Sequence, residues 1–152
     1  MTDLKDTLRR DLTSAMKAQR TFDTQTLRLV LAAIAKEEVA GASARQLSLA
    51  EEQAVLRRES RQRREAAEIY AGAGRAELAD KERAEAELID RYLPAPLSPE
   101  ELDAIVAAVL AGHPDATLKQ MGLIVKAVNA EVQGRAEGAL VAQKVKAALA
   151  GS

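Results

Sequence analysis

Apolar residues recur along this chain at steps of three and four, which is the spacing of one face of an α-helix. One stripe runs through Leu4–Met16 and a second through Leu27–Ile34. The segment Thr21-Phe22-Asp23-Thr24 is expected to separate these two helices, with Asp23 or Thr24 as the N-cap of the second. The chain therefore opens with a predicted pair of helices.

Two further helices are predicted before the proline-rich segment that begins at residue 94. Ser48 and Glu51 have the spacing of a capping box, in which each side chain accepts a hydrogen bond from the backbone amide of the other residue. A long helix is expected from there to about Tyr70, followed by another over about 76–92. The first part of the chain thus contains about four helices.

Proline marks the clearest boundary in the sequence. Segment 94–99 contains three prolines, which remove backbone donors and restrict the preceding residue, so no helix is expected to cross it. Ser98–Glu101 then has the pattern of a new helix start, with proline in the first turn. We predict an N-terminal helical domain over 1–95 and a C-terminal domain over 96–152.

The second part predicts a small bundle of three helices, which makes the fold all-α. The first helix carries the stripe Leu102–Leu110, and the last carries apolar residues between Val141 and Leu149. Between them, Thr117–Gln120 forms a second predicted capping box. Gly122 is expected to let another helix approach closely. The middle helix is expected to pack through one narrow seam: Leu118, Met121, Val125, Val128 and Val132.

Composition offers little catalytic chemistry. The chain has no cysteine, which excludes disulfides, thiolate nucleophiles and cysteine-ligated metals. The single histidine, His113, lies between a glycine and a proline, as expected of a surface turn. Glycine-rich phosphate loops follow a strand, and none is predicted here. We therefore expect no catalytic residue, no metal and no cofactor.

Charge and hydropathy indicate the class of protein. The formal net charge is −1, so any binding of nucleic acid must depend on local patches. No apolar run approaches the roughly 18 residues expected of a membrane span, and the charged N-terminus does not resemble a signal peptide. These features predict a cytoplasmic protein without a membrane partner.

One cluster of arginines occurs within the predicted long helix. Residues 57–65 include no apolar side chain, so this part of the helix is expected to project into solvent or to be covered by arginine stems. The arginines suit a run of phosphates; they are Arg57, Arg58, Arg61 and Arg64. The alternative is an ordinary solvated face with ion pairs four residues apart: Glu59 with Arg63, Arg61 with Glu65, and Arg64 with Glu68.

A second set of cations lies near the end of the chain. After residue 116, only Glu131 and Glu137 oppose five cations: Lys119, Lys126, Arg135, Lys144 and Lys146. The loop between Gly134 and Gly138 also offers free amides at a predicted helix N-terminus, where phosphate binds readily. These residues are candidate RNA contacts. The alternative is the ordinary set of surface lysines that small helical domains carry.

Short pieces along the whole chain match a known pattern. The pieces are Ala15-Met16-Lys17, Leu27-Arg28, Ala73-Gly74-Arg75, Leu78-Ala79, Lys81-Glu82, Tyr92-Leu93-Pro94, Met121-Gly122, Gly134-Arg135-Ala136-Glu137-Gly138 and Val145-Lys146. By these pieces the chain resembles the GatB/YqeY family, which comprises YqeY-like proteins and the tail of the B subunit of the tRNA-dependent Asp/Glu amidotransferase. The resemblance implies that Gly122, Lys126, Gly134, Arg135 and Gly138, together with Lys146, contact tRNA.

Three functions stay open on this basis. The first is a non-catalytic accessory protein that binds tRNA through the C-terminal bundle. The second is a protein–protein adaptor that docks on an amidotransferase, a synthetase or another copy of itself. The third is an auxiliary part of a glutamine-dependent carbon–nitrogen ligase assembly. The family's ligase activity is implied only by analogy, because the chain lacks the large catalytic portion of the B subunit.

Overall fold

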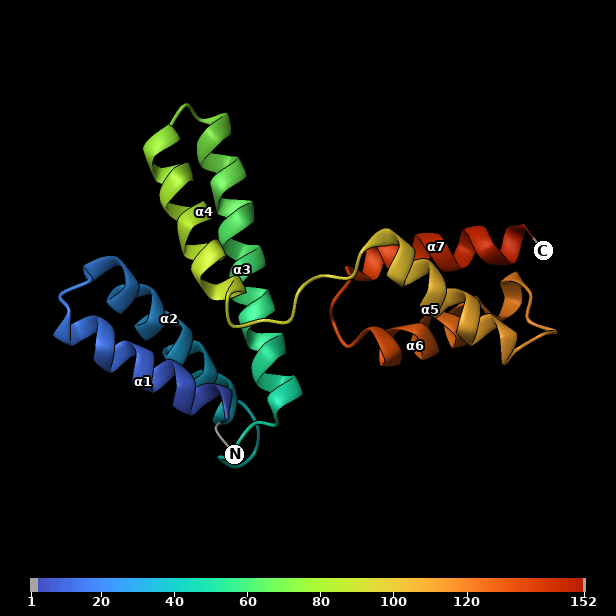
Figure 1. The fold of residues 1–152 in the computed structure, drawn as a ribbon, viewed down its shortest axis with the longest axis horizontal. Helices are drawn as coiled ribbons and strands as arrows, with labels where there is room; N and C mark the ends of the chain where they lie inside the picture. The colour runs from blue at the N-terminus through green and yellow to red at the C-terminus, as the bar shows by residue number, and fades with distance from the viewer. Residues whose placement is uncertain (1–2, 152) are drawn as a thin grey trace. The chain divides into compact units, whose positions relative to one another are not determined.

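A computed structural model describes residues 3–151, and within that range it contains seven α-helices, one short 3-10 helix and no strand (Figure 1). The prediction of an all-α fold is confirmed. The chain divides into two compact units, the first ending at Pro94 and the second beginning at Ala95. No helix within the described range is long and apolar enough to cross a membrane.

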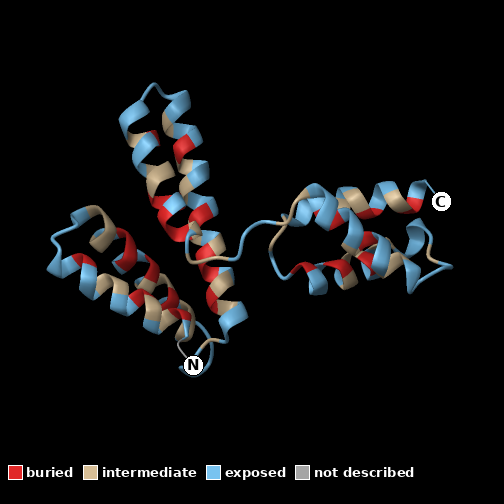
Figure 2. Ribbon diagram, viewed as in Figure 1, coloured by how far each residue is buried: buried red, intermediate tan, exposed pale blue. Residues whose placement is uncertain are grey.

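Unit 1 consists of two helical hairpins. The helices α1 (Leu4–Lys17) and α2 (Thr21–Glu38) form the first, and α3 (Leu49–Gly72) and α4 (Ala76–Asp90) form the second. Apolar stripes from the hairpins meet in one core, drawn in red in Figure 2. Its buried members are Leu4, Leu8, Ala15, Leu27, Val30, Ile34, Val55, Leu56 and Ile89.

The turn between α1 and α2 differs from the prediction. Neither Asp23 nor Thr24 is an N-cap, because α2 already begins at Thr21 and no side chain caps it. The amide of Gln19 donates to the Met16 carbonyl (3.1 Å), and the amide of Arg20 donates to the Ala15 carbonyl (2.9 Å). These bonds form a Schellman-type ending with Gln19 in the left-handed region at φ 58°. The sequence did not predict this turn, because glutamine occupies the left-handed position where glycine is usual.

The capping box at Ser48 is confirmed. Its hydroxyl accepts from the Glu51 amide at 3.2 Å, and Glu51 Oε1 accepts from the Ser48 amide at 3.1 Å. The helix that it begins ends at Gly72, close to the predicted position. Both bonds satisfy amides that a helix start would otherwise leave unpaired.

The arginine-rich stretch of α3 does not simply project into solvent, so that interpretation is wrong for its inner face. Ser60 is buried and its hydroxyl donates to Asp90 Oδ1 at 2.6 Å. Arg63 Nε donates to Glu85 Oε2 at 3.2 Å, and Arg64 also pairs with Asp90. Polar side chains therefore continue the α3–α4 contact where no apolar residue is available, and each has a partner.

Unit 2 is a three-helix bundle with one extra turn. Its elements are α5 (Pro99–Ala111), the 3-10 turn η1 (Leu118–Gln120), α6 (Met121–Val132) and α7 (Gly138–Ala150). The predicted capping box at Ser98 is present at the start of α5. The core consists of Leu102, Val106, Ile124, Val128, Val132, Val141, Val145 and Leu149.

The predicted seam of the middle helix is partly wrong. Ile124 is fully buried although the seam omitted it, whereas Leu118 is 50% exposed. The Thr117 capping box is formed, but it begins the 3-10 turn rather than α6. A 3-10 turn has three residues per turn, so a stripe that starts in it does not continue along the same face of the following α-helix. A Cβ at Gly122 would meet nothing within 4 Å, so the close helix approach expected there is absent within the described chain.

Candidate nucleic-acid interface

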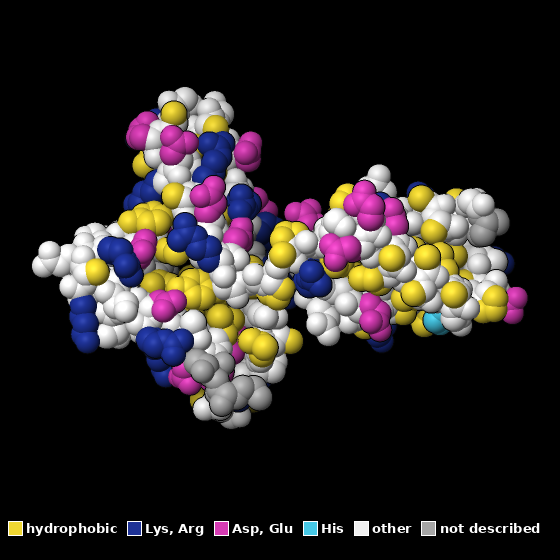
Figure 3. All heavy atoms as spheres, in the orientation of Figure 1, with side chains coloured by type: hydrophobic (Ala, Val, Ile, Leu, Met, Phe, Trp, Pro, Cys, Tyr) yellow, Lys and Arg dark blue, Asp and Glu magenta, His cyan; other side chains and the backbone are white. Residues whose placement is uncertain are grey.

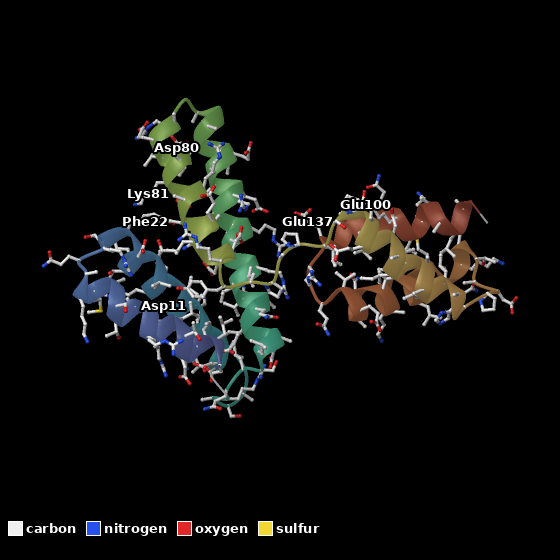
Figure 4. All side chains as sticks on the ribbon, viewed as in Figure 1. Asp11, Phe22, Asp80, Lys81, Glu100 and Glu137 are labelled. Atoms are coloured by element: carbon white, nitrogen blue, oxygen red, sulfur yellow. The ribbon has the colours of Figure 1, made fainter. Side chains whose placement is uncertain are left out.

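The three helices of unit 2 differ in charge. The charged residues of α5 are all acidic, namely Glu100, Glu101 and Asp103. On the face drawn in Figure 3, acidic side chains gather over α5, and Figure 4 labels Glu100 there together with Glu137. The helix α6 carries Lys126 and Glu131, and α7 carries Lys144 and Lys146. A polyanion would therefore be repelled by α5 and attracted by the lysines of the other two helices.

Lys119 and Lys126 are both exposed, on η1 and α6 respectively. Neither forms an ion pair with a described residue, so both ammonium groups are available to a ligand. Gly122 lies between them with open space above its Cα. An approaching backbone would meet no side chain at that position.

Arg135 is only partly available as a phosphate contact. Its Nε donates to the Ala95 carbonyl at 2.8 Å, and its own carbonyl accepts from the Leu97 amide at 2.8 Å. The residue therefore connects the loop between α6 and α7 to the segment that precedes α5. The turn that places it uses two left-handed residues, Gln133 at φ 51° and Gly134 at φ 78°.

The N-terminus of α7 is a poorer phosphate site than its sequence indicates. Glu137 occupies the N-cap position without a side-chain cap bond, so a carboxylate stands beside the free amides of the helix start. Gly138 is the first residue of α7, and a Cβ there would meet nothing within 4 Å. Neither residue shows a steric or electrostatic feature specific to phosphate.

The two lysines of α7 have different environments. Lys144 Nζ donates to Asp103 Oδ1 at 2.7 Å, an ion pair that joins α7 to α5. Lys146 is exposed and has no ion-pair partner among residues 3–151. Of the five cations predicted in this region, three are therefore unpaired: Lys119, Lys126 and Lys146.

The arginines of α3 are not one free patch. Arg58 pairs with Glu37 at 3.6 Å, and Arg64 pairs with Asp90. Burial lowers the pKa of Arg57, and Arg61 is exposed and forms no ion pair with a described residue. Among the ion pairs expected within the helix, Glu59 with Arg63 is confirmed at 2.7 Å; Arg64 instead reaches α4, and Glu68 pairs with Arg83 at 3.7 Å.

His113 lies at the surface turn after α5, as predicted. Its Nδ1 lies 3.0 Å from the Val109 carbonyl oxygen. A shallow hollow beside it is also lined by Pro114, Asp115, Ala116, Gln120 and Leu123. Within residues 3–151, no three His, Asp or Glu side chains gather as metal ligands would.

Sequence reasoning missed a second hollow, at the turn between α1 and α2. Its lining is polar apart from one methionine: Met16, Gln19, Thr21, Thr24, Gln25 and Arg28. Arg28 Nη2 lies 3.7 Å from Met16 Sδ across it. The signal available in the sequence was the pair of matching pieces Met16-Lys17 and Leu27-Arg28, which the unusual turn at Gln19 brings together.

Comparison with known proteins identifies the family. A family model described as Yqey-like protein matches residues 5–149. The chain belongs to the YqeY-like family. The YqeY-like chain is also similar to "Altered inheritance of mitochondria protein 41, mitochondrial" of Meyerozyma guilliermondii, with 36% identity over 88 residues. That alignment covers 58% of this chain and 45% of the relative, so less than half of the relative is matched.

Proposed function

We propose that this YqeY-like chain is a non-catalytic accessory protein that binds tRNA through unit 2. The observation that carries the proposal is the separation of charge in that unit. Unpaired lysines lie on η1, α6 and α7, whereas the charged side chains of α5 are acidic. The resemblance to the tail of the amidotransferase B subunit suggests the same ligand class.

The contact residues divide into two groups. Lys119, Lys126 and Lys146 are proposed to contact phosphates directly, because each is exposed and free of a carboxylate. Gly134, Arg135 and Gly138 shape the loop beside them, and Lys144 is held by Asp103. Arg57 and Arg61 are weaker candidates on α3.

The form of RNA follows from the shortage of stacking groups in unit 2, where His113 and Arg135 are the side chains with planar groups able to stack on a base. The aromatic residues of the chain are Phe22, Tyr70 and Tyr92, and all three precede unit 2. Proteins that bind unpaired bases stack them on aromatic side chains or arginine planes. Unit 2 is therefore expected to recognise the folded backbone of a duplex region, as tRNA presents it, rather than a single strand.

A salt-dependent titration tests the proposal. The full chain is titrated with total tRNA at two salt concentrations, with a single-stranded RNA and a random duplex as competitors. Each phosphate contact releases counterions, so affinity is expected to fall steeply with salt, and tRNA is expected to compete best. Absence of binding at low salt would refute the proposal.

Matched variants locate the site. Lys119→Ala with Lys126→Ala is expected to weaken binding and to reduce the salt slope by about two, one for each lost phosphate contact. Arg9→Ala with Arg10→Ala removes the same charge from exposed positions of α1 and is expected to leave binding unchanged. An equal loss in both double variants would show general electrostatic attraction instead of a site in unit 2.

An adaptor that docks on an amidotransferase, a synthetase or another protein is the second candidate. It is favoured by the exposed apolar side chains of Leu29 on α2 and Val39 at its C-cap. A cytoplasmic location stays a prediction, because the fungal relative is named as mitochondrial.

A further inference from the structure

The helix α2 is apolar on two faces instead of one. Its inner face contributes Leu27, Val30 and Ile34 to the core of unit 1. A helix at a protein surface normally carries polar residues opposite its core face, and a helix that is apolar all round is normally buried. The outer face of α2 departs from that rule.

The outer stripe of α2, as we call it, consists of exposed residues at helical spacing: Gln25, Arg28, Leu29, Ala32, Ala35, Lys36 and Val39, the last of which is the C-cap. Leu29 is 48% exposed and Val39 is 64% exposed. Alanines lie between them, so the stripe is apolar along its middle. Such a surface loses free energy to water unless a partner covers it.

The charges of the outer stripe have one sign. Neither Arg28, whose Nη2 lies 3.7 Å from the sulfur of Met16, nor Lys36 forms an ion pair with a described residue. The carboxylates of α2 are already engaged elsewhere: Asp23 with Arg20, Glu37 with Arg58, and Glu38 with Lys5. A covering partner must therefore supply its own carboxylates.

The shape of the stripe suits a helix. Ala32 and Ala35 have short side chains, which allow the axis of a second helix to approach closely. At the start of α2, the stripe runs into the hollow that Gln25 and Arg28 line together with Met16. The hollow can receive a side chain from one end of the bound helix.

We propose that the outer stripe of α2 docks an acidic amphipathic helix of another protein, with apolar side chains over Leu29 to Val39 and carboxylates beside Arg28 and Lys36. Nothing in this proposal depends on RNA binding by unit 2. The two surfaces belong to different units of the chain and can be disabled separately.

Charge argues against other occupants. A second copy would bring Arg28 and Lys36 of both chains together with no carboxylate between them, which is unfavourable. RNA would place phosphates against an apolar centre flanked by only two cations. A membrane-surface helix needs bulky apolar residues that reach into the lipid, whereas the middle of this stripe is mostly alanine.

Peptide probes of opposite charge test the chemistry. The first probe is a helical peptide with leucine and alanine on one stripe and glutamate along both flanks, and the second carries lysine in place of glutamate. Binding to the labelled full chain is measured by fluorescence anisotropy. Only the acidic peptide is expected to bind, and the variant Arg28→Glu with Lys36→Glu is expected to reverse that preference. Equal binding of both peptides, or of neither, would overturn the proposal.

A matched leucine locates the binding surface. Leu29→Ser is expected to weaken the acidic peptide at least about tenfold, as loss of a central apolar contact does. Leu123 on α6 is 56% exposed, so Leu123→Ser is a control of the same chemistry in unit 2 and is expected to have no effect. An equal loss in both variants would overturn the assignment to α2.

Photo-crosslinking from position 32 tests the native partner. The expected product joins α2 to a helical segment of another protein whose flanks are acidic, as identified by mass spectrometry of the crosslinked peptide. A crosslink to a second copy, to RNA or to lipid would overturn the proposal, and so would the absence of any adduct.

Discussion

Arg135 Nε donates a 2.8 Å hydrogen bond to the carbonyl of Ala95, across 40 residues of sequence. The carbonyl of the same arginine accepts from the amide of Leu97 at 2.8 Å. One residue thus fastens the start of unit 2 to the loop between α6 and α7. An arginine that sequence patterns marked as a ligand contact is committed largely to shaping its own loop.

These two hydrogen bonds predict that the segment around Leu97 opens more often when Arg135 is replaced. Both Arg135→Ala and Arg135→Lys remove the Nε donor, and each is expected to lower the free energy of unfolding by about 1 kcal/mol. Hydrogen exchange at the Leu97 amide is expected to become faster in both variants. Lys146→Ala, which removes an exposed charge, should leave that amide unchanged. Unaltered exchange in Arg135→Lys would show that charge alone matters at this position.

The part-buried Ser60–Asp90 bond predicts coupling between α3 and α4. Ser60→Ala is expected to destabilise unit 1 by about 1 kcal/mol, because it removes the hydrogen bond that the buried Ser60 hydroxyl donates to Asp90. A double-mutant cycle with Asp90→Ala, measured by urea unfolding, should give a coupling energy of at least about 0.5 kcal/mol. Additive effects would show that the bond contributes nothing to the hairpin.

Tyr92 is expected to titrate late. Burial raises the pKa of its phenol, and the 2.6 Å hydrogen bond to Asp11 raises it further. Because the folded pKa lies above the unfolded value of about 10, this contribution to stability is complete below pH about 10 and is lost as pH rises further. In a Tyr70→Phe background, phenolate absorbance should appear only at higher pH, and Asp11→Asn should move it back. Ionisation of Tyr92 in the folded chain with a midpoint at about pH 10, the ordinary value for tyrosine, would contradict this prediction.

Glu51 is expected to titrate early. Its hydrogen bond to Arg45 lowers its pKa to about 2, with a further contribution from the backbone of Ser48. A lowered folded pKa means that this stabilisation is present above the unfolded value of about 4.3 and is lost as pH falls from there toward 2. Carboxyl NMR can follow the titration, and Arg45→Ala should raise the pKa. A midpoint near 4 in the wild type would contradict the hydrogen bond between Arg45 and Glu51.

The helices and the serine caps of α3 and α5 could be predicted because the responsible forces act locally. Ser48 and Ser98 cap helices three residues from the glutamates that complete each box, and both boxes formed as expected. The membership of the chain in the YqeY-like family was also visible in short matching pieces, and a family model over residues 5–149 shows it.

Three features of the candidate sites depend on residues that are distant in sequence. Asp90 accepts a hydrogen bond from Ser60 and pairs with Arg64, both on a helix earlier in the chain. The Ala95 carbonyl accepts a hydrogen bond from Arg135, and Asp103 accepts one from Lys144. Each such pair decides whether a charge is free for a ligand or engaged within the fold. No local pattern of charge could separate the two cases.

The sequence by itself determined the all-helical class, the capping boxes and the family, since helix periodicity and capping involve residues within about one turn of each other. Tertiary structure decided which lysines are unpaired, which face of α6 is buried and that α2 leaves an apolar stripe exposed. The physical reason is that burial and ion pairing depend on which helices pack together, and packing joins positions such as Arg135 and Ala95 that lie far apart along the chain.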